Sequence, residues 1–481
     1  MTEPRDSYSP ERRTALLFTG TGADGAYHAG AMRALQEAGV KIDVVGGRGI
    51  GAIAAVLAAV DGGSQLWDAG GFWRSPMVAH LYRWRWPFTV LRWLAIALLV
   101  VLAIPAAVML LALIVYPIAL LLGMAGLDAG AQFVEAFVGM LSSAFAPPAL
   151  PTWIPRLAAL LSTAALIVLG AGAWLAWWRS ALHRRSAGNR LWTLLGSPID
   201  AGTAIEHATE TVWRLLKGGA SIKTPEADDL SRRYSELLAE NLGQPGFREL
   251  LLVVHDLDAS RDLVFGLVRE PYRRMLFPAP GSVSASRRAE AHDLSSGMQG
   301  FLADVLAAAL SLPGVSESRL VKFAPDAYWR GETHRLGDRP GSIGRLLEEA
   351  AAAGAEQVMI VSASPEPPGP HELRPPRLDG LGRVGEQIAS AETAALSDAV
   401  RHLHHRFQGL YLIRPSHNPI RPLDLIGAYD ERSDRVQTLE ELMERGYEDA
   451  YRQFIEPFLG ASGERVPQLG RRSTDQGPSS D

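Results

Sequence analysis

The sequence predicts an α/β fold interrupted by an inserted pair of apolar helices. Short apolar runs alternating with Gly-rich turns near the start of the chain indicate the α/β part. Two long stretches nearly free of charge indicate the inserted helices. The chain has 481 residues, more than one average domain needs. Its net charge of −5 gives no reason to expect a nucleic acid partner, and the absence of Cys excludes disulfides and thiolate sites.

The chain is organised around residues 14–61. The pattern there predicts two strands, each followed by a Gly-rich turn and a helix. The strands cover residues 15–19 and 43–46, the turns 20–25 and 47–51, and the helices 26–37 and 52–60. Each turn opens a helix whose first N–H groups are unpaired, so both helix starts suit a bound anion or an oxyanion.

Both turns carry recognisable motifs. The first reads Gly20-Thr21-Gly22-Ala23-Asp24-Gly25 and the second reads Gly47-Arg48-Gly49-Ile50-Gly51. With their separation, these motifs resemble those of the patatin-like phospholipases, a family of lipid acyl hydrolases. The resemblance implies a three-layer α/β/α domain in which residues 47–51 form the nucleophile elbow. It assigns an oxyanion loop to Gly20, Thr21, Gly22 and Gly25. Gly49 stands at the position of the family's nucleophilic Ser and has no hydroxyl.

The second catalytic group of the family also lacks a clear counterpart. In the family, the Asp of a D-G-G or D-G-A turn serves the Ser. The best alignment places this Asp at Arg330, while Asp338, eight residues later, leaves the registration open. Two missing groups predict a catalytically inactive protein that keeps a lipid-binding or scaffolding role. The alternative is an active lipid acyl hydrolase with Thr21 or Ser342 as its nucleophile.

A third interpretation is a nucleotide- or phosphometabolite-binding membrane module. Residues 20–25 also fit G-x-G-x-x-G after a strand, and Asp43 lies about 20 residues farther on. We expect no cofactor. Three His residues between residues 402 and 405 predict a solvated helix face rather than a metal site; they are His402, His404 and His405.

The charges of the two turns allow two interpretations, three unrelated surface charges or a rebuilt pocket that binds an anion. Asp24 stands where the family has a basic residue, whereas Arg48 and Arg330 stand at the elbow and at the expected Asp position. We expect Asp24 to pair with one Arg and the other Arg to face an anion at the helix starts. The pocket should then prefer acidic to neutral lipid.

Residues 81–185 are expected to form a transmembrane hairpin with spans at 93–116 and 157–178. A helix of the first length rises roughly 36 Å, enough to cross a hydrocarbon core. Arg residues flank both outer ends, whereas the connection carries Asp128 and Glu135. By the positive-inside rule, the outer ends and the α/β domain face the cytoplasm. We therefore expect a multi-pass protein of the cytoplasmic (inner) membrane with membrane lipid as its partner.

The other boundaries follow from composition. We expect a disordered leader at 1–13, the first part of the α/β domain at 14–80 and a helical segment at 186–245. The second part of the domain is expected at 246–460, and a disordered tail at 461–481.

Overall fold

A computed structural model of the chain describes residues 8–144, 150–181, 196–278, 285–325, 327–370, 376–377 and 379–459. The chain forms two compact units. Unit 1 comprises Met1–Arg83 and Ala201–Asp481, and unit 2 comprises Trp84–Asp200. The expected tail at 461–481 lies outside the described residues.

Unit 1 is built on a mixed sheet that has nine strands among the described residues. The strands are β1 (Thr14–Thr19), β2 (Val44–Gly47), β5 (Glu249–Asp256), β6 (Arg261–Leu267), β7 (Ala291–Asp293), β8 (Arg319–Lys322), β9 (Thr333–Gly337), β10 (Gln357–Ser362) and β11 (Gly409–Ile413). The order is β11-β10-β1-β2-β5-β6-β7, and β9 pairs with both β5 and β8. Strands β11, β10, β1, β2 and β5 run parallel, whereas β6 and β9 run antiparallel to β5.

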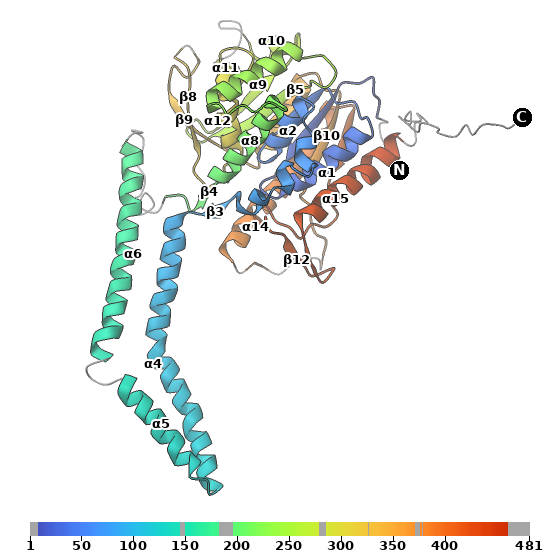
Figure 1. Ribbon diagram of the computed structural model, residues 1–481. Helices are drawn as coiled ribbons and strands as arrows, with labels where there is room; N and C mark the ends of the chain where they lie inside the picture. Colours follow the sequence, from blue (N-terminus) through green and yellow to red (C-terminus); the bar gives the residue numbers. More distant parts are fainter. Residues whose placement is uncertain are drawn as a thin grey trace, which may run out of the picture. The chain divides into compact units, whose positions relative to one another are not determined.

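Helices pack on both faces of this sheet, as the α/β prediction requires (Figure 1). The helices of unit 1 are α1 (Asp24–Glu37), α2 (Gly51–Ala59), α3 (Ser64–Trp67), α8 (Gly202–Lys217), α9 (Ala227–Asn241), α10 (Tyr272–Leu276), α11 (Ala285–Glu290), α12 (Leu302–Ala309), α13 (Ser342–Ala352), α14 (Gly380–Leu403) and α15 (Leu439–Ala450). Shorter helical turns are η1 (Phe72–Arg74), η2 (Pro76–His80), η3 (Gln299–Phe301) and η4 (His404–Arg406), and η5 (Tyr451–Leu459) is a π-helix.

The β1 strand illustrates why the central strands are apolar throughout. Leu17 packs with Ile343 and Leu346 of α13 in the core on one face, whereas Phe18 projects to the opposite face, where it contacts His28 of α1. Every residue of β1 is buried. A parallel strand covered on both faces needs apolar side chains at consecutive positions.

The predicted β-α-β-α unit at residues 14–61 is confirmed. Strands β1 and β2 are parallel neighbours, with Phe18 paired with Gly47 near their ends. Both Gly-rich turns therefore leave the same edge of the sheet side by side. This adjacency brings residues 20–25 and 47–51 together.

The expected disordered leader is wrong for residues 8–13, whose side chains make contacts within unit 1; residues 1–7 lie outside the described residues. The Tyr8 ring contacts Phe454 of η5 with centroids 5.3 Å apart. Arg13, also within the expected leader, is buried and pairs with Glu249 at 2.6 Å. The composition of the first residues is polar, but these side chains find partners far along the chain.

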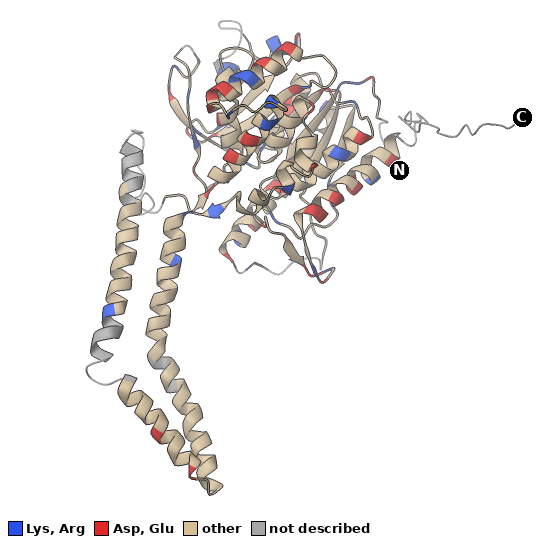
Figure 2. Cartoon of the chain, in the orientation of Figure 1, with Lys and Arg blue, Asp and Glu red and all other residues tan. Residues whose placement is uncertain are grey.

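Unit 2 contains three helices among its described residues. They are α4 (Trp86–Met124), α5 (Ala129–Ala144) and α6 (Leu150–Ala181). Helix α4 packs against both others and bends partway along its length (Figure 1). The proline at position 105 within it predicts such a bend. Figure 2 shows that α4 is almost free of charged residues.

The connection between the two expected spans contains a further helix. Residues 129–144 form α5, which packs along α4, with Phe137 contacting Tyr116. Among the described residues one helix segment, Trp86–Ile104, is long and apolar enough to cross a membrane, and its side chains are not buried. The second expected span corresponds to the shorter apolar stretch Arg156–Gly172 of α6.

Two short strand pairs complete the structure. Strands β3 (Arg83–Trp84) and β4 (Ile199–Asp200) pair where the chain enters and leaves unit 2. Strands β12 (Ala428–Asp430) and β13 (Arg435–Gln437) form an antiparallel hairpin in unit 1. The expected helical segment at 186–245 contains α8 and α9, which belong to unit 1; its residues 186–195 lie outside the described residues.

Candidate functional site: a filled nucleophile elbow

The second Gly-rich turn has the geometry of a nucleophile elbow. Strand β2 ends at Gly47 and α2 begins at Gly51, so the chain reverses within three residues. Gly49 sits at the corner with φ of +57°. A nucleophile elbow holds its central residue in this strained, left-handed region. The backbone conformation of Gly49 is thus the one that an elbow position requires.

The space for a side chain at Gly49 is already filled. A Cβ atom built on Gly49 would lie 2.2 Å from the carbonyl oxygen of Gly20 and 3.1 Å from Oδ2 of Asp338. The first distance is far shorter than any van der Waals contact. A backbone carbonyl of the first turn thus occupies the place from which a nucleophile would project.

The same carbonyl also takes up an oxyanion donor. In elbow hydrolases, the N–H of the residue after the nucleophile is one of the oxyanion donors. Here that N–H belongs to Ile50, and it donates to the Gly20 carbonyl at 2.9 Å. An oxyanion hole needs unpaired donors aimed at the reacting oxygen. The elbow half of the hole is therefore occupied.

The first Gly-rich turn is closed over as well. The Thr21 N–H donates to Oδ2 of Asp24 at 3.0 Å, and the Ala23 N–H donates to the Pro422 carbonyl at 2.8 Å. The Pro422 carbonyl lies so close that a Cβ on Gly22 would come within 1.9 Å of it. The turn has the expected position beside the elbow, but its N–H groups point into internal bonds.

Arg48 lies at the centre of the site and is fully buried. Its Nε donates to Oδ1 of Asp338 at 3.0 Å, and its Nη2 donates to Oδ2 of the same carboxylate. Both Nη atoms lie 3.1 Å from Oε1 of Glu392, and Nη1 also donates to Thr19 Oγ1 at 3.1 Å. Burial opposes the charge of Arg48, but the negative charges of Asp338 and Glu392 outweigh it and raise the pKa of Arg48.

Arg330 does not occupy the expected Asp position, and this prediction is wrong. Arg330 is exposed in a turn with φ of +47°, before β9. Asp338 follows β9 directly, so the five residues of the strand separate the two by roughly 16 Å. Asp338 is the carboxylate that faces Gly49. The elbow therefore has a carboxylate beside it, whereas Gly49 itself offers no hydroxyl.

Asp24 does not pair with an Arg, contrary to expectation. Its side chain accepts the Thr21 N–H and lies against Glu392. Burial, the negative charge of Glu392 and a hydrogen bond with Glu392 raise the pKa of Asp24 well above its usual range. Burial also raises the pKa of Glu392. Two buried carboxyl groups in contact are most stable when they share a proton.

These contacts overturn the expected anion site. The cluster combines one cation, Arg48, with the three carboxyl groups of Asp24, Asp338 and Glu392, and all four side chains are buried. The guanidinium already donates to carboxylates and hydroxyls along its whole edge. An incoming anion would meet excess negative charge, so Arg48 forms an internal ionic lock.

Glu392 is the site residue that the sequence reasoning missed. It lies on α14 in a stripe of buried residues that also contains Ile388, Leu396 and Ala399. These positions follow the helical period, so an amphipathic reading places Glu392 on the buried face. A buried Glu needs a cationic or hydrogen-bonding partner. That signal was present in the sequence, although it does not name Arg48 as the partner.

The two candidate substitute nucleophiles are both buried. Thr21 Oγ1 donates to Oε1 of Glu392 at 2.6 Å and accepts from Nη2 of Arg48 at 3.3 Å. Ser342 Oγ donates to Oδ1 of Asp262 at 2.8 Å. Thr21 thus has an acceptor for its proton, but a neighbouring cation holds its lone pair.

The remaining candidate residues lie in ordinary structural surroundings. The side chain of Asp43 accepts the Thr14 N–H at 2.9 Å. It therefore links the start of β1 to the segment before β2, whereas a nucleotide site would need this carboxylate for a ribose hydroxyl. His402 is exposed, with Nδ1 2.7 Å from the Asp398 carbonyl. Within the described part of the chain, no group of three or more His, Asp or Glu residues could hold a metal ion.

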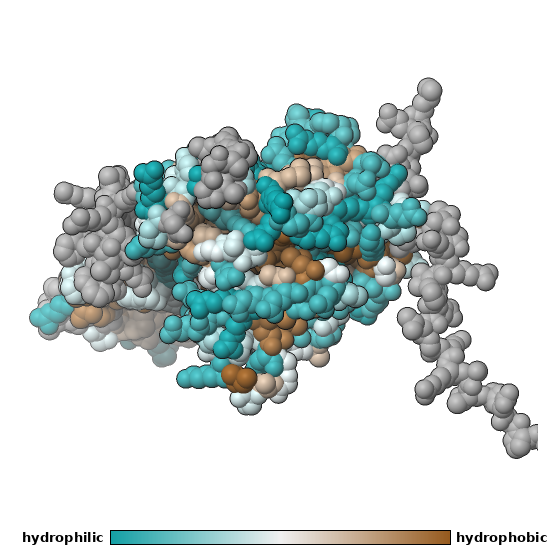
Figure 3. All heavy atoms as spheres, turned by 90° about the horizontal axis from the view of Figure 1, so that it is seen from above, coloured by the Kyte–Doolittle hydropathy of each residue, from teal (hydrophilic) through white to brown (hydrophobic). Residues whose placement is uncertain are grey.

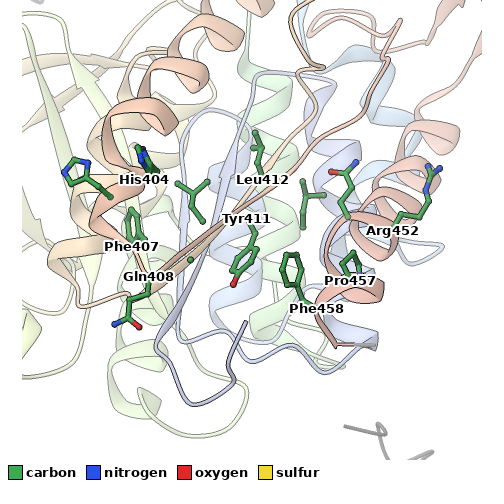
Figure 4. A pocket seen from close by; sticks show the side chains of 13 residues that line it. His404, Phe407, Gln408, Tyr411, Leu412, Arg452, Pro457 and Phe458 are labelled. Carbon is green, nitrogen blue, oxygen red and sulfur yellow. The ribbon is translucent and has the colours of Figure 1, made fainter. Parts of the chain in front are cut away.

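A groove lies away from this site, along the edge strand β11 (Figure 4). Its volume is about 690 Å³, and its wall includes Tyr411 of β11 and Phe458 of η5, whose ring centroids are 4.8 Å apart. His404 and Arg452 lie at its rim. None of the residues predicted to form the site lines this groove.

Comparison with known proteins agrees with the geometry of the two turns. The family model Patatin-like phospholipase matches residues 16–104, and no curated protein matches the chain significantly. The crystal structure of VipD from Legionella pneumophila is similar over 94% of this chain and 67% of that chain, with 12% identity and a TM-score of 0.28. A likeness this weak carries no argument. The similarity to the patatin-like phospholipase family is therefore confined to residues 16–104, which include both glycine turns.

Proposed function

We propose that this chain is a patatin-like protein without hydrolase activity, held in a membrane by unit 2 and acting there as a scaffold. The absence of hydrolase activity is proposed from the Gly20 carbonyl, which fills the space that a nucleophilic side chain at Gly49 would need. Acyl hydrolysis by this fold needs an activated hydroxyl and unpaired oxyanion donors. The site offers neither at the elbow.

The ionic lock supports the same conclusion. In an active dyad, the carboxylate partner must be available to the nucleophile as a base. Both oxygens of Asp338 instead accept hydrogen bonds from Arg48. A carboxylate held by a bidentate Arg is a weak base. The cluster joins β2, the end of β9 and α14, so its role is to hold unit 1 together.

A second candidate function is hydrolysis with Thr21 as nucleophile. One observation favours it, namely the 2.6 Å bond from Thr21 Oγ1 to Glu392. A fluorophosphonate reagent labels only an activated hydroxyl, so it separates the two proposals. We expect no labelling of the wild-type protein and no hydrolysis of phospholipids or p-nitrophenyl esters. Labelling that disappears in Thr21→Val but persists in Ser342→Ala would overturn the non-hydrolytic proposal.

The membrane part of the proposal rests on α4. Residues Trp86–Ile104 form an uncovered apolar helix segment with a mean hydropathy of 2.3. Nineteen residues of helix rise about 28 Å, close to the thickness of a hydrocarbon core. Arg83 and Arg85 precede this segment and Arg92 lies in its second helical turn, which favours a cytoplasmic position for its start and for unit 1.

Because the chain has no Cys, single Cys variants test this topology cleanly. Leu127→Cys, in the turn between α4 and α5, should react with an impermeant thiol reagent in intact cells. Ile222→Cys, equally exposed but in unit 1, is the control and should react only after lysis. The reverse pattern would overturn the orientation. Extraction of the full chain by alkaline carbonate would overturn the insertion itself.

A further inference from the structure

The β12–β13 hairpin presents an unusual apolar face. Ile426, just before β12, is 81% exposed, Tyr429 is 56% exposed and Val436 is 60% exposed. Tyr429 and Val436 are directly paired across the two strands, so their side chains lie on one face. We call Ile426, Tyr429 and Val436 the hairpin patch.

The hairpin patch is carried by a well-held element. Asp430 at the end of β12 is buried and accepts from Ser433 Oγ at 2.8 Å and from Gln437 Nε2 at 2.7 Å. His417 Nε2 lies 2.8 Å from the same carboxyl group. These contacts fix the hairpin from inside while its apolar side chains stay in solvent. Exposure of the patch is therefore a property of the fold.

Within unit 1, the hairpin lies beside the segment that leads to the apolar helix. Thr438 connects β13 to α15, where Glu440 pairs with Arg74 of η1 at 3.2 Å. The chain then passes through η2, where Met77 is exposed, and leaves unit 1 at Arg83. Figure 1 shows β12 and the end of this segment at β3 along the same, lower edge of unit 1.

The chain between unit 1 and the candidate span is very short. Unit 1 ends at Arg83 and the span begins at Trp86. Three residue steps of extended chain reach about 10 Å. If Trp86–Ile104 crosses a bilayer, as the proposed function holds, the edge of unit 1 at Arg83 lies at the lipid headgroups. Apolar side chains on that edge then meet the bilayer interface.

Resting on that proposed function, we propose that the hairpin patch is a second membrane contact, inserted into the interfacial region of the bilayer that α4 crosses. Tyr429 suits this depth because its ring is apolar and its hydroxyl is polar. Arg432, exposed in the hairpin turn, suits anionic headgroups. The face of unit 1 seen in Figure 3 is largely hydrophilic, with apolar areas between the hydrophilic ones.

The test uses the full chain in lipid nanodiscs with one Cys at a time, labelled with an environment-sensitive fluorophore. Ile426→Cys reports on the hairpin patch. Met275→Cys is the matched control, because Met275 is 65% exposed on α10, at the upper edge of unit 1 in Figure 1. We expect a blue-shifted emission at position 426 and a loss of intensity when lipids carry a shallow spin-label quencher. Position 275 should show neither change.

The outcomes separate this inference from the proposed function. If the chain fails to float with lipid, membrane insertion itself is refuted. If it floats but the labels at 426 and 275 behave alike, the hairpin patch does not touch the bilayer and the inference is wrong. Tyr429→Cys gives a second position on the same face. Emission changes at 426 that are insensitive to quencher lipids would assign the patch to a protein partner and also overturn the inference.

Discussion

Restoring a serine at the elbow should not restore a hydrolase. In Gly49→Ser the new Cβ would lie 2.2 Å from the Gly20 carbonyl oxygen, so the first turn or the elbow must move. The left-handed backbone at φ of +57° adds a second penalty, because a residue with a Cβ atom is strained there. We therefore expect Gly49→Ser to be destabilised and to remain inactive.

The expected loss in the free energy of unfolding of Gly49→Ser is the sum of these two penalties. A non-glycine residue in the left-handed region costs about 1–2 kcal/mol. Forcing extra atoms into a packed site costs a further 1–3 kcal/mol, roughly. The free energy of unfolding should then fall by about 2–5 kcal/mol, the sum of both penalties.

Gly39→Ser provides the matched control. Gly39 has φ of +67°, but no atom lies within 4 Å of a Cβ built there. Its substitution carries only the backbone penalty of about 1–2 kcal/mol. Urea unfolding of the full chain in detergent, followed by tryptophan fluorescence, gives both midpoints under the same conditions. The difference between the two variants isolates the overlap with Gly20.

Two results would refute this reasoning. Equal midpoints for Gly49→Ser and Gly39→Ser would show that the Gly20 carbonyl yields without penalty. Hydrolysis of a p-nitrophenyl ester by Gly49→Ser, with labelling by a fluorophosphonate, would show that the first turn can swing away. The new hydroxyl would then meet Asp338, whose Oδ2 lies 3.1 Å from the built Cβ.

Three further predictions concern the ionic lock and the apolar helix. Asp338→Asn removes one charge from the buried pair with Arg48 and should lower the free energy of unfolding by about 3–5 kcal/mol. The control Glu366→Gln, in the exposed pair with Arg414, should leave the urea midpoint unchanged. Equal effects of the two substitutions would refute the ionic lock. Because the pKa of Asp24 is raised, the folded protein holds a proton that the unfolded chain releases above about pH 4, so stability falls as pH rises. Asp24→Asn should flatten this dependence between pH 5 and pH 8, and parallel profiles for the two proteins would contradict the shared proton. Leu99→Arg in the Trp86–Ile104 segment should weaken membrane insertion by about 2.5–3.5 kcal/mol, seen as a smaller carbonate-resistant fraction; an unchanged fraction would show that this segment does not cross the bilayer.

The sequence by itself determined the elements whose signals are local. Each strand, turn and helix of residues 14–61 is specified by neighbours within a few positions, and the structure confirms their order. The loss of the hydroxyl at Gly49 is visible from one residue. The apolar character of α4 is also local, since its hydropathy needs no tertiary contact.

Only the tertiary structure decided which side chains meet at the elbow. Arg48 is separated from Asp338 by 290 residues and from Glu392 by 344 residues. Whether residue 330 or residue 338 reaches Gly49 depends on the end of β9 that lies at the site, and strand pairing fixes that end. An alignment of short motifs contains no information about this strand pairing.

The direction of the Gly20 carbonyl is a further tertiary outcome. A glycine-rich turn can aim either its N–H groups or its carbonyl groups at a neighbouring loop, because glycine accepts both backbone conformations. Here Ile50 and the Pro422 segment supply the partners that select the closed arrangement. The sequence therefore identified a site without a nucleophile, while packing between distant segments turned that site into a buried ionic lock.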